Sequence, residues 1–188
     1  MIGRRALRFL AGAVAMTGAV FLASGLWIPA KAALAQWLLQ RAWSASRADN
    51  APVKAWPWAD AAPVARLHLN GEAMVVLSGG SGEALAFAPT LVPGSAPPGA
   101  PGLGILAGHR DTHFALLERL PPGSRIELED LSGRRTAYRV KNAHVLAISR
   151  LSVPADSRRR LALVTCWPFN AIDPSGSERF VLFADAVP

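Results

Sequence analysis

The sequence predicts a mainly β domain, folded as a closed or nearly closed barrel with one or two short helices, behind an N-terminal transmembrane helix. Two observations support this fold class. Residues 9–30 form an apolar run without a charged residue, and from Val64 onward short strand-like segments alternate with turns rich in Gly and Pro. Many short strands with few helices favour a barrel. We therefore divide the chain into a basic end with an anchor (1–30), a helix with a tether (31–63) and a β domain (64–188).

The apolar run is long enough to cross a membrane. At about 1.5 Å per residue, a helix over residues 9–30 matches a hydrocarbon core of roughly 30 Å. Arg4, Arg5 and Arg8 precede it, and the positive-inside rule then places the N-terminus in the cytoplasm and the β domain outside. A cleaved signal peptide has the same basic start, but its apolar core is usually about 7–15 residues. The length therefore favours an uncleaved single-pass anchor in the cytoplasmic membrane.

Residues 31–43 carry apolar side chains near one face at helical spacing, among them Trp37 and Trp43. This pattern indicates an amphipathic helix, which either lies on the outer membrane interface or packs on the β domain. Residues 44–63 are rich in Ala, Pro and polar residues, and we expect a tether whose end touches the domain.

The β domain opens with a predicted hairpin, in which Asn70-Gly71 separates strands at 64–69 and 73–77. Asn-Gly between alternating apolar segments is the strongest short hairpin signal. Residues 89–102 read as a turn-rich loop, because Pro cannot take part in a central strand. Further strands are expected at 103–107, 125–129, 136–146, 161–165 and 179–184, with a turn at Ser132-Gly133 and one or two helical turns within 114–120.

The formal charge is +7, and the basic residues are mostly scattered arginines. Scattered charge is typical of a solvated surface, so we expect no nucleic-acid partner. The chain has one cysteine. Outside the cytoplasm cysteines usually occur as disulfide pairs, so a single one is a buried apolar residue, an intermolecular bridge or a reactive thiol.

Three groups suited to acyl transfer stand at predicted strand ends: Cys166 after one strand, His109 after another, and Arg179 at the start of the last. A thiol has an ordinary pKa of about 8.5 and is activated by a nearby imidazole or cation. A histidine protonates a departing amine. An arginine offers a permanent charge with several donors to an oxyanion.

The motifs AGHRDTHF (107–114), LALVTCWPF (161–169) and RFVLFA (179–184) follow in this order behind the anchor. In this combination the chain resembles the sortase family from about residue 64 to its end. The resemblance implies an eight-stranded β-barrel and a cysteine transpeptidase that cleaves an LPxTG-like signal between Thr and Gly. The GHRDT and VTCWPF forms resemble short sortases without a long N-terminal lid, including the type found in Gram-negative bacteria.

The resemblance also assigns roles. Cys166 matches the nucleophile that forms a thioacyl enzyme, His109 matches the general acid and later base, and Arg179 matches the residue that binds substrate and steadies the oxyanion. Thr165 matches a secondary substrate or oxyanion contact. Ala162 departs from the family, which has Thr there in its TLxTC-like strand.

By the same resemblance, residues 148–159 lie between the two strands that flank the groove for the sorting signal. Leu151, Val153 and Pro154 are its candidate contacts with the Leu-Pro part of the signal. The implied partners are a secreted protein that carries the signal and an amine acceptor.

Three alternatives remain. Water instead of an amine would make the chain a cysteine peptidase, and a barrel without chemistry would be a tethered peptide-binding module. The spacing of His109 and His113 also suits two metal ligands on a helix, although a HExxH glutamate is missing. We expect neither a metal nor a cofactor. Glu127, Glu129 and Asp130 are interpreted as solvent-facing acids on a strand rather than as a calcium site.

Overall fold

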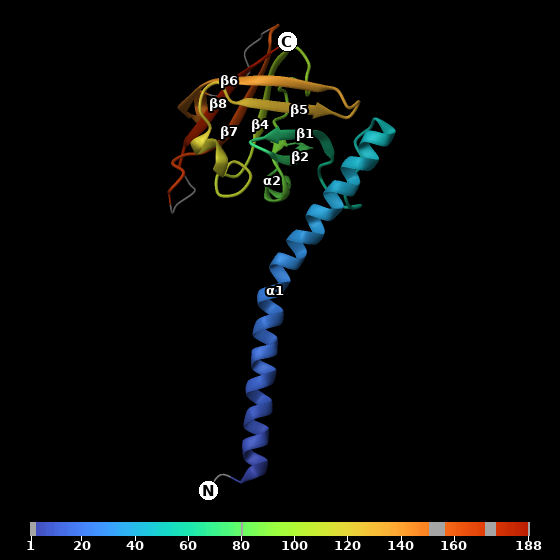
Figure 1. Ribbon diagram of the computed structural model, residues 1–188, viewed down its shortest axis with the longest axis vertical. Coiled ribbons are helices and arrows are strands. Elements are labelled where there is room, and N and C mark those ends of the chain that lie inside the picture. Colours follow the sequence, from blue (N-terminus) through green and yellow to red (C-terminus); the bar gives the residue numbers. More distant parts are fainter. Residues whose placement is uncertain (1–2, 80, 151–156, 172–175, 188) are drawn as a thin grey trace. The chain divides into compact units, whose positions relative to one another are not determined.

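The computed structural model of the chain describes residues 3–79, 81–150, 157–171 and 176–187 (Figure 1). The chain forms two compact units, residues 1–37 and 38–188. Helix α1 (Arg4–Asp49) begins in the first unit and ends in the second. Its mean hydropathy reaches 1.9 over 18 residues, none of them buried, so its length and composition suffice to cross a membrane.

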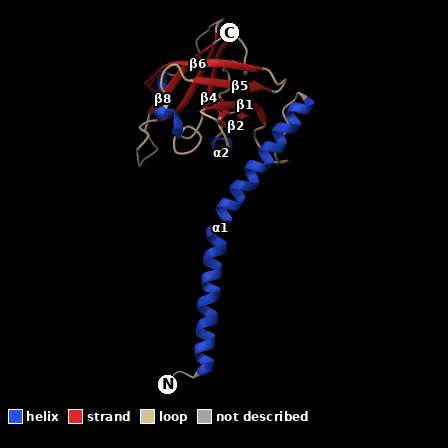
Figure 2. Ribbon diagram, in the orientation of Figure 1, coloured by secondary structure: helices blue, strands red, loops and turns tan. Residues whose placement is uncertain are grey.

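In the described part of the second unit, eight strands close into a barrel in the order β1-β2-β3-β4-β7-β8-β6-β5 (Figures 1 and 2). The strands are β1 (Pro63–Leu69), β2 (Glu72–Ser78), β3 (Thr90–Leu91), β4 (Gly102–Ala107), β5 (Arg125–Asp130), β6 (Arg135–Ala147), β7 (Arg159–Cys166) and β8 (Glu178–Ala186). The short helices are α2 (Gly82–Phe87), η1 (Ala115–Arg119) and η2 (Ile148–Arg150). The predicted eight-stranded barrel behind a long apolar helix is thereby confirmed.

The β1–β2 hairpin forms where the sequence predicted it. Asn70 and Gly71 have φ of 51° and 83°, and a two-residue hairpin turn with positive φ at both positions matches the twist of its strands. The turn between β5 and β6 is also where it was expected. There Asp130 accepts hydrogen bonds from the Ser132 hydroxyl and from the main-chain and side-chain N–H groups of Arg134. Partial burial acts to raise the pKa of Asp130, but these bonds together bring it below its ordinary value.

Successive side chains of a strand point to opposite faces, and apolar side chains lie both inside the barrel and on its outer face. The barrel interior is filled from all sides, and Leu106, Leu163 and Leu182 are fully buried there. A second apolar cluster covers the outer face of β4, β7 and β8. Its buried members are Leu103, Ile105, Ala162, Val164 and Val181. Because residues i and i+2 of a strand share a face, each of these strands has one row in the core and one row in the outer cluster.

The end of α1 packs on the barrel. Leu39 and Trp43 are 1% and 3% exposed and cluster with Val75 and Leu77 of β2. Residues 44–49, expected in the tether, continue this helix. Of the two interpretations of residues 31–43, packing on the β domain therefore holds for residues 38–43, which belong to the second unit.

One expectation about local structure was wrong, and one short element was missed. The loop expected at residues 89–102 contains β3, which joins β2 to β4 through two residues, Thr90 and Leu91, that pair with both neighbours. Such a strand depends on its partners and has no periodicity of its own. The sequence also gave no sign of α2, whose six residues are too few for a helical pattern; its N-cap is Ser81, which accepts a bond from Ala84 N.

Glu129 is also not a solvent-facing acid. It is 3% exposed, and its carboxylate pairs with Arg47 at the end of α1, with His68 on β1 and with Arg135 on β6. A buried carboxylate needs such partners because its desolvation is costly.

Candidate active site

Strands β7 and β8 bring Cys166 and Arg179 together. The two strands are antiparallel, and Cys166 lies directly opposite Arg179 in their register. Cys166 shares the outer face with Ala162 and Val164, and Arg179 shares it with Val181. Side chains directly opposite on one face have Cβ atoms about 4.5–5.5 Å apart. The two side chains therefore start from neighbouring Cβ positions on the outer face of the barrel.

Strand β4 brings His109 to the same level. It runs parallel to β7 with Ala107 opposite Val164, and Gly108 N donates to Val164 O at 3.1 Å. His109 follows one residue later, level with Cys166 on an adjacent strand, and adjacent strands lie about 4.8 Å apart. The structure thus gathers the three predicted groups from β4, β7 and β8 at one end of the sheet.

Two buried contacts fix the segment that carries His109. The Thr165 hydroxyl donates to Gly108 O at 2.7 Å, and Thr165 is 2% exposed. The fully buried Phe114 ring lies so close to Gly108 that a Cβ there would be 2.7 Å from its Cδ2 atom. Phe114 N also donates to His109 O at 3.0 Å. The hydroxyl of Thr165 is therefore used inside the protein, and its predicted contact with substrate stays a prediction.

Arg110 is a site residue whose role the sequence did not reveal. It is 5% exposed, and its guanidinium donates to Pro168 O and Ala171 O, each at 2.6 Å, and to Asp111 Oδ1 at 3.1 Å. The signal in the sequence was its place, directly after His109 at a strand end. Its partners, 58 and 61 residues away along the chain, could not be inferred.

An aromatic cluster adjoins the thiol. Trp167 stacks on Phe180 with ring centroids 6.1 Å apart, and Phe169 meets both rings edge to face at 5.8 and 5.1 Å. Phe169 and Phe180 also pack against the barrel core. The chain leaving Cys166 is thereby held against β8, the strand that carries Arg179.

The Arg179 side chain bonds to main-chain carbonyls, and the surroundings of His113 lower its pKa. Arg179 Nη1 donates to Gly176 O at 2.6 Å and to Glu178 O at 2.8 Å, which orients the guanidinium along the loop that enters β8. His113 is half-buried; burial lowers its pKa, a hydrogen bond with the Phe87 main chain acts to raise it, and the nearby His109 lowers it further. Within the described residues, no three His, Cys, Asp or Glu side chains gather in a way that could hold a metal ion.

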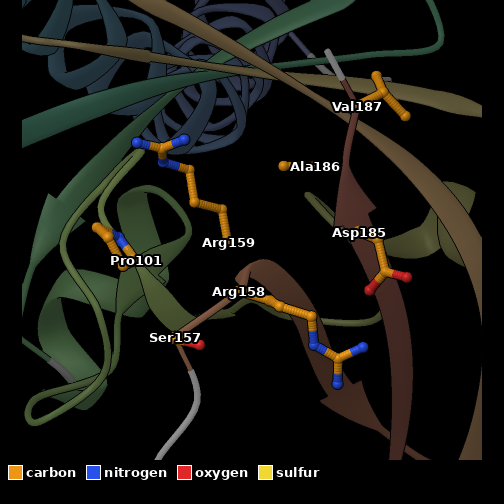
Figure 3. Close-up of a pocket in the computed structure, with 7 residues that line it drawn as sticks. All are labelled: Pro101, Ser157, Arg158, Arg159, Asp185, Ala186 and Val187. Carbon is orange, nitrogen blue, oxygen red and sulfur yellow. The ribbon is translucent and has the colours of Figure 1, made fainter.

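A cavity of about 610 Å³ lies far from these groups (Figure 3). Its lining includes Arg158, Arg159 and Asp185, at the start of β7 and the end of β8. Cys166 lies at the other end of β7, seven residues and about 23 Å away at 3.3 Å per residue. This cavity is therefore separate from the end of β7 that carries Cys166. The predicted substrate contacts Leu151, Val153 and Pro154 lie outside the described residues.

Comparison with known proteins identifies the family. A model described as the sortase domain matches residues 66–187. The chain therefore belongs to the sortase family and is a cysteine transpeptidase. A search of curated proteins found no match.

Several solved structures share the fold. A sortase D5 transpeptidase from Clostridium perfringens is similar at 20% identity over 68% of this chain and 80% of that one, with a TM-score of 0.60. Sortase A from Corynebacterium diphtheriae is 20% identical over 70% of this chain, with a TM-score of 0.60, and the match spans 63% of that chain. Sortase C-1 from Actinomyces oris is 24% identical over 67% of this chain and 75% of that one, with a TM-score of 0.58.

Proposed function

We propose that this sortase cleaves an LPxTG-like sorting signal between Thr and Gly and joins the new carboxyl end to an amine acceptor. The observation that carries the proposal is the register of three neighbouring strands, which sets Cys166 opposite Arg179 and His109 at the same level. The outer apolar cluster of β4, β7 and β8 continues from these groups along the sheet.

In the first half of the reaction, Cys166 Sγ attacks the carbonyl carbon of the substrate threonine. The developing oxyanion is stabilised by the Arg179 guanidinium, which offers five N–H donors in a fixed plane. The C–N bond to glycine then breaks, and His109 gives a proton to the departing amine. The product is a thioester between the threonine carbonyl and Cys166.

In the second half, the acceptor amine attacks the thioester carbon and loses a proton to His109. The C–S bond breaks, which restores the Cys166 sulfur and leaves an amide. Water in place of the amine would give a free acid, so access for an amine separates a transpeptidase from a peptidase. We further propose that Thr165, Leu151, Val153 and Pro154 contribute to the signal's binding.

The anchor and its flanks support a topology. Arg4, Arg5 and Arg8 precede the apolar helix, which supports an N-terminus in the cytoplasm and a catalytic domain outside the cytoplasmic membrane. The GHRDT and VTCWPF motifs support the short type without a lid, as in Gram-negative bacteria. The natural partner would be a secreted protein with the signal at its C-terminus.

The test uses the full-length chain in detergent with an LPxTG-like peptide and triglycine as the amine. We expect mass spectrometry to show a thioacyl adduct on Cys166 and an amide product, both lost in Cys166→Ala. His109→Ala should abolish the amide product, whereas the matched control His68→Ala, on β1 and away from β4, β7 and β8, should not. An adduct that yields only free acid would replace the transpeptidase by a peptidase. No adduct with any such peptide would refute the proposed signal.

A further inference from the structure

Arg110 is a charged side chain in the interior, and its contacts join two loops. It follows His109 in the chain and is 5% exposed. Two of its nitrogens donate to main-chain carbonyls of the loop after Cys166, those of Pro168 and Ala171. Its third contact, Asp111, is an exposed neighbour with a side chain 69% exposed.

Burial of this charge is costly unless the hydrogen bonds are made. A guanidinium stays protonated, and a buried charge requires partners. Asp111 is largely solvated, so the two main-chain carbonyls are the partners that compensate most for the burial of the charge. The planar fork of a guanidinium fixes both carbonyls at once, a geometry that a single ammonium reproduces poorly. The position of the Cys166 loop is thus tied to residue 110.

The hydrogen bonds of Arg110 also restrain its neighbour His109. His109 is exposed, whereas Gly108 on one side and Arg110 on the other are buried. Gly108 is held to β7 through Val164 O and the Thr165 hydroxyl, and Arg110 is held to the loop after Cys166. The residues on both sides of His109 are therefore hydrogen-bonded to the strand and the loop that carry the thiol.

We propose that Arg110 is a positioning residue of the transpeptidase: it holds His109 in register with Cys166 through the carbonyls of Pro168 and Ala171. This inference rests on the proposed function, in which the imidazole and the thiol act together. It assigns Arg110 no contact with substrate. Its effect is on the distance and orientation between two groups, to which catalysis is sensitive.

The experiment measures alkylation of the full-length chain in detergent by iodoacetamide at neutral pH. Cys166 is the single cysteine of the chain, so every adduct reports on it. We expect His109→Ala to slow alkylation about tenfold, because an adjacent imidazole favours the reactive thiolate. Arg110→Met should slow it about fivefold, and the double variant should be no slower than His109→Ala, since residues that act as a unit are not additive.

Two further variants separate positioning from stability. Arg110→Lys keeps the charge and one or two donors, and should recover part of the loss. Arg119→Met, which removes an exposed arginine from η1 in the same segment, should alkylate like the unmodified chain. Circular dichroism and thermal melting establish that each variant is folded. With peptide and triglycine, Arg110→Met should lower kcat several-fold and leave KM within about twofold.

If the double variant is slowed by the product of the factors measured for His109→Ala and Arg110→Met, the two residues act independently and the proposal is overturned. A normal alkylation rate in Arg110→Met would also overturn it. Loss of folding in both Arg110 variants would assign the residue to stability alone, which also overturns it. No effect of His109→Ala would refute the pairing of His109 with Cys166 and, with it, this inference. A failure of peptide turnover while the alkylation results hold would instead refute the proposed signal and leave the role of Arg110 standing.

Discussion

The substitution Gly108→Ala tests whether the active site requires a residue without a side chain at position 108. A Cβ at this residue would lie 2.7, 2.9 and 3.0 Å from three carbons of the Phe114 ring. Contacts this short force a displacement, and the ring is fully buried in the barrel core, so it has little room to move. Gly108 does not have a positive φ, so the expected effect is steric and not a backbone preference.

Overpacking of this kind costs about 1–3 kcal/mol. For a chain of this size, about 2 kcal/mol corresponds to a melting temperature lower by about 4–8 °C. The assay is thermal unfolding by circular dichroism, with alkylation of Cys166 by iodoacetamide as a measure of the site. Because Phe114 N bonds to His109 O, displacement of the ring should also slow alkylation.

Gly82→Ala is the matched control, because this glycine opens α2 and its Cβ would meet nothing within 4 Å. It should melt at or slightly above the temperature of the unmodified chain. Phe114→Leu in the Gly108→Ala background should relieve the clash, so the double variant should lose less stability than the sum of the singles. Equal melting temperatures for Gly108→Ala and Gly82→Ala would refute the steric argument.

Two other predictions concern the domain outside the site. Asp130→Asn should cost about 1–2 kcal/mol at pH 7, from weakened hydrogen bonds to a charged group. Because the folded pKa of Asp130 lies below its ordinary value, this contribution is present above about pH 4 and is lost as the pH falls further. In urea unfolding, the difference in unfolding free energy between Asp130→Asn and the unmodified chain should be smaller at pH 3 than at pH 7. An equal difference at both pH values would contradict the prediction. Trp43→Ala should cost about 3–5 kcal/mol in thermal or urea unfolding, whereas Trp58→Ala, at a side chain 79% exposed, should cost little; equal effects would refute the packing of α1 on β2.

The parts of the fold that the sequence predicted depend on local signals. Asn70-Gly71 fixes its hairpin by backbone conformation, and alternation marks β5 and β6. Cys166, His109 and Arg179 were predicted as site residues because each is a polar residue next to an apolar strand segment, within motifs that resemble those of sortases. These signals need no knowledge of which strands become neighbours.

The remaining parts depend on partners that lie far along the chain. Strand β3 exists because β2 and β4 pair with its two residues. Glu129 can be buried because Arg47, 82 residues before it and on helix α1, forms an ion pair with its carboxylate. The sequence pattern of alternating acids was the same as for an exposed strand, so the error was one of tertiary context and not of strand assignment.

The groups that we propose to react differ in burial from the residues around them. His109 is exposed and Cys166 and Arg179 are partly exposed, as a substrate requires, whereas Arg110, Phe114 and Thr165 are buried. The side chains of Arg110 and Thr165 bond to main-chain carbonyls of the neighbouring segment, and the Phe114 ring packs in the barrel core. The backbone register between β4, β7 and β8 places the proposed catalytic side chains. We therefore expect a substitution at a buried neighbour to lower activity even though that neighbour makes no contact with substrate. If the proposed roles hold, the geometry of the reaction depends on the pairing of the barrel strands, at whose ends the proposed catalytic residues lie.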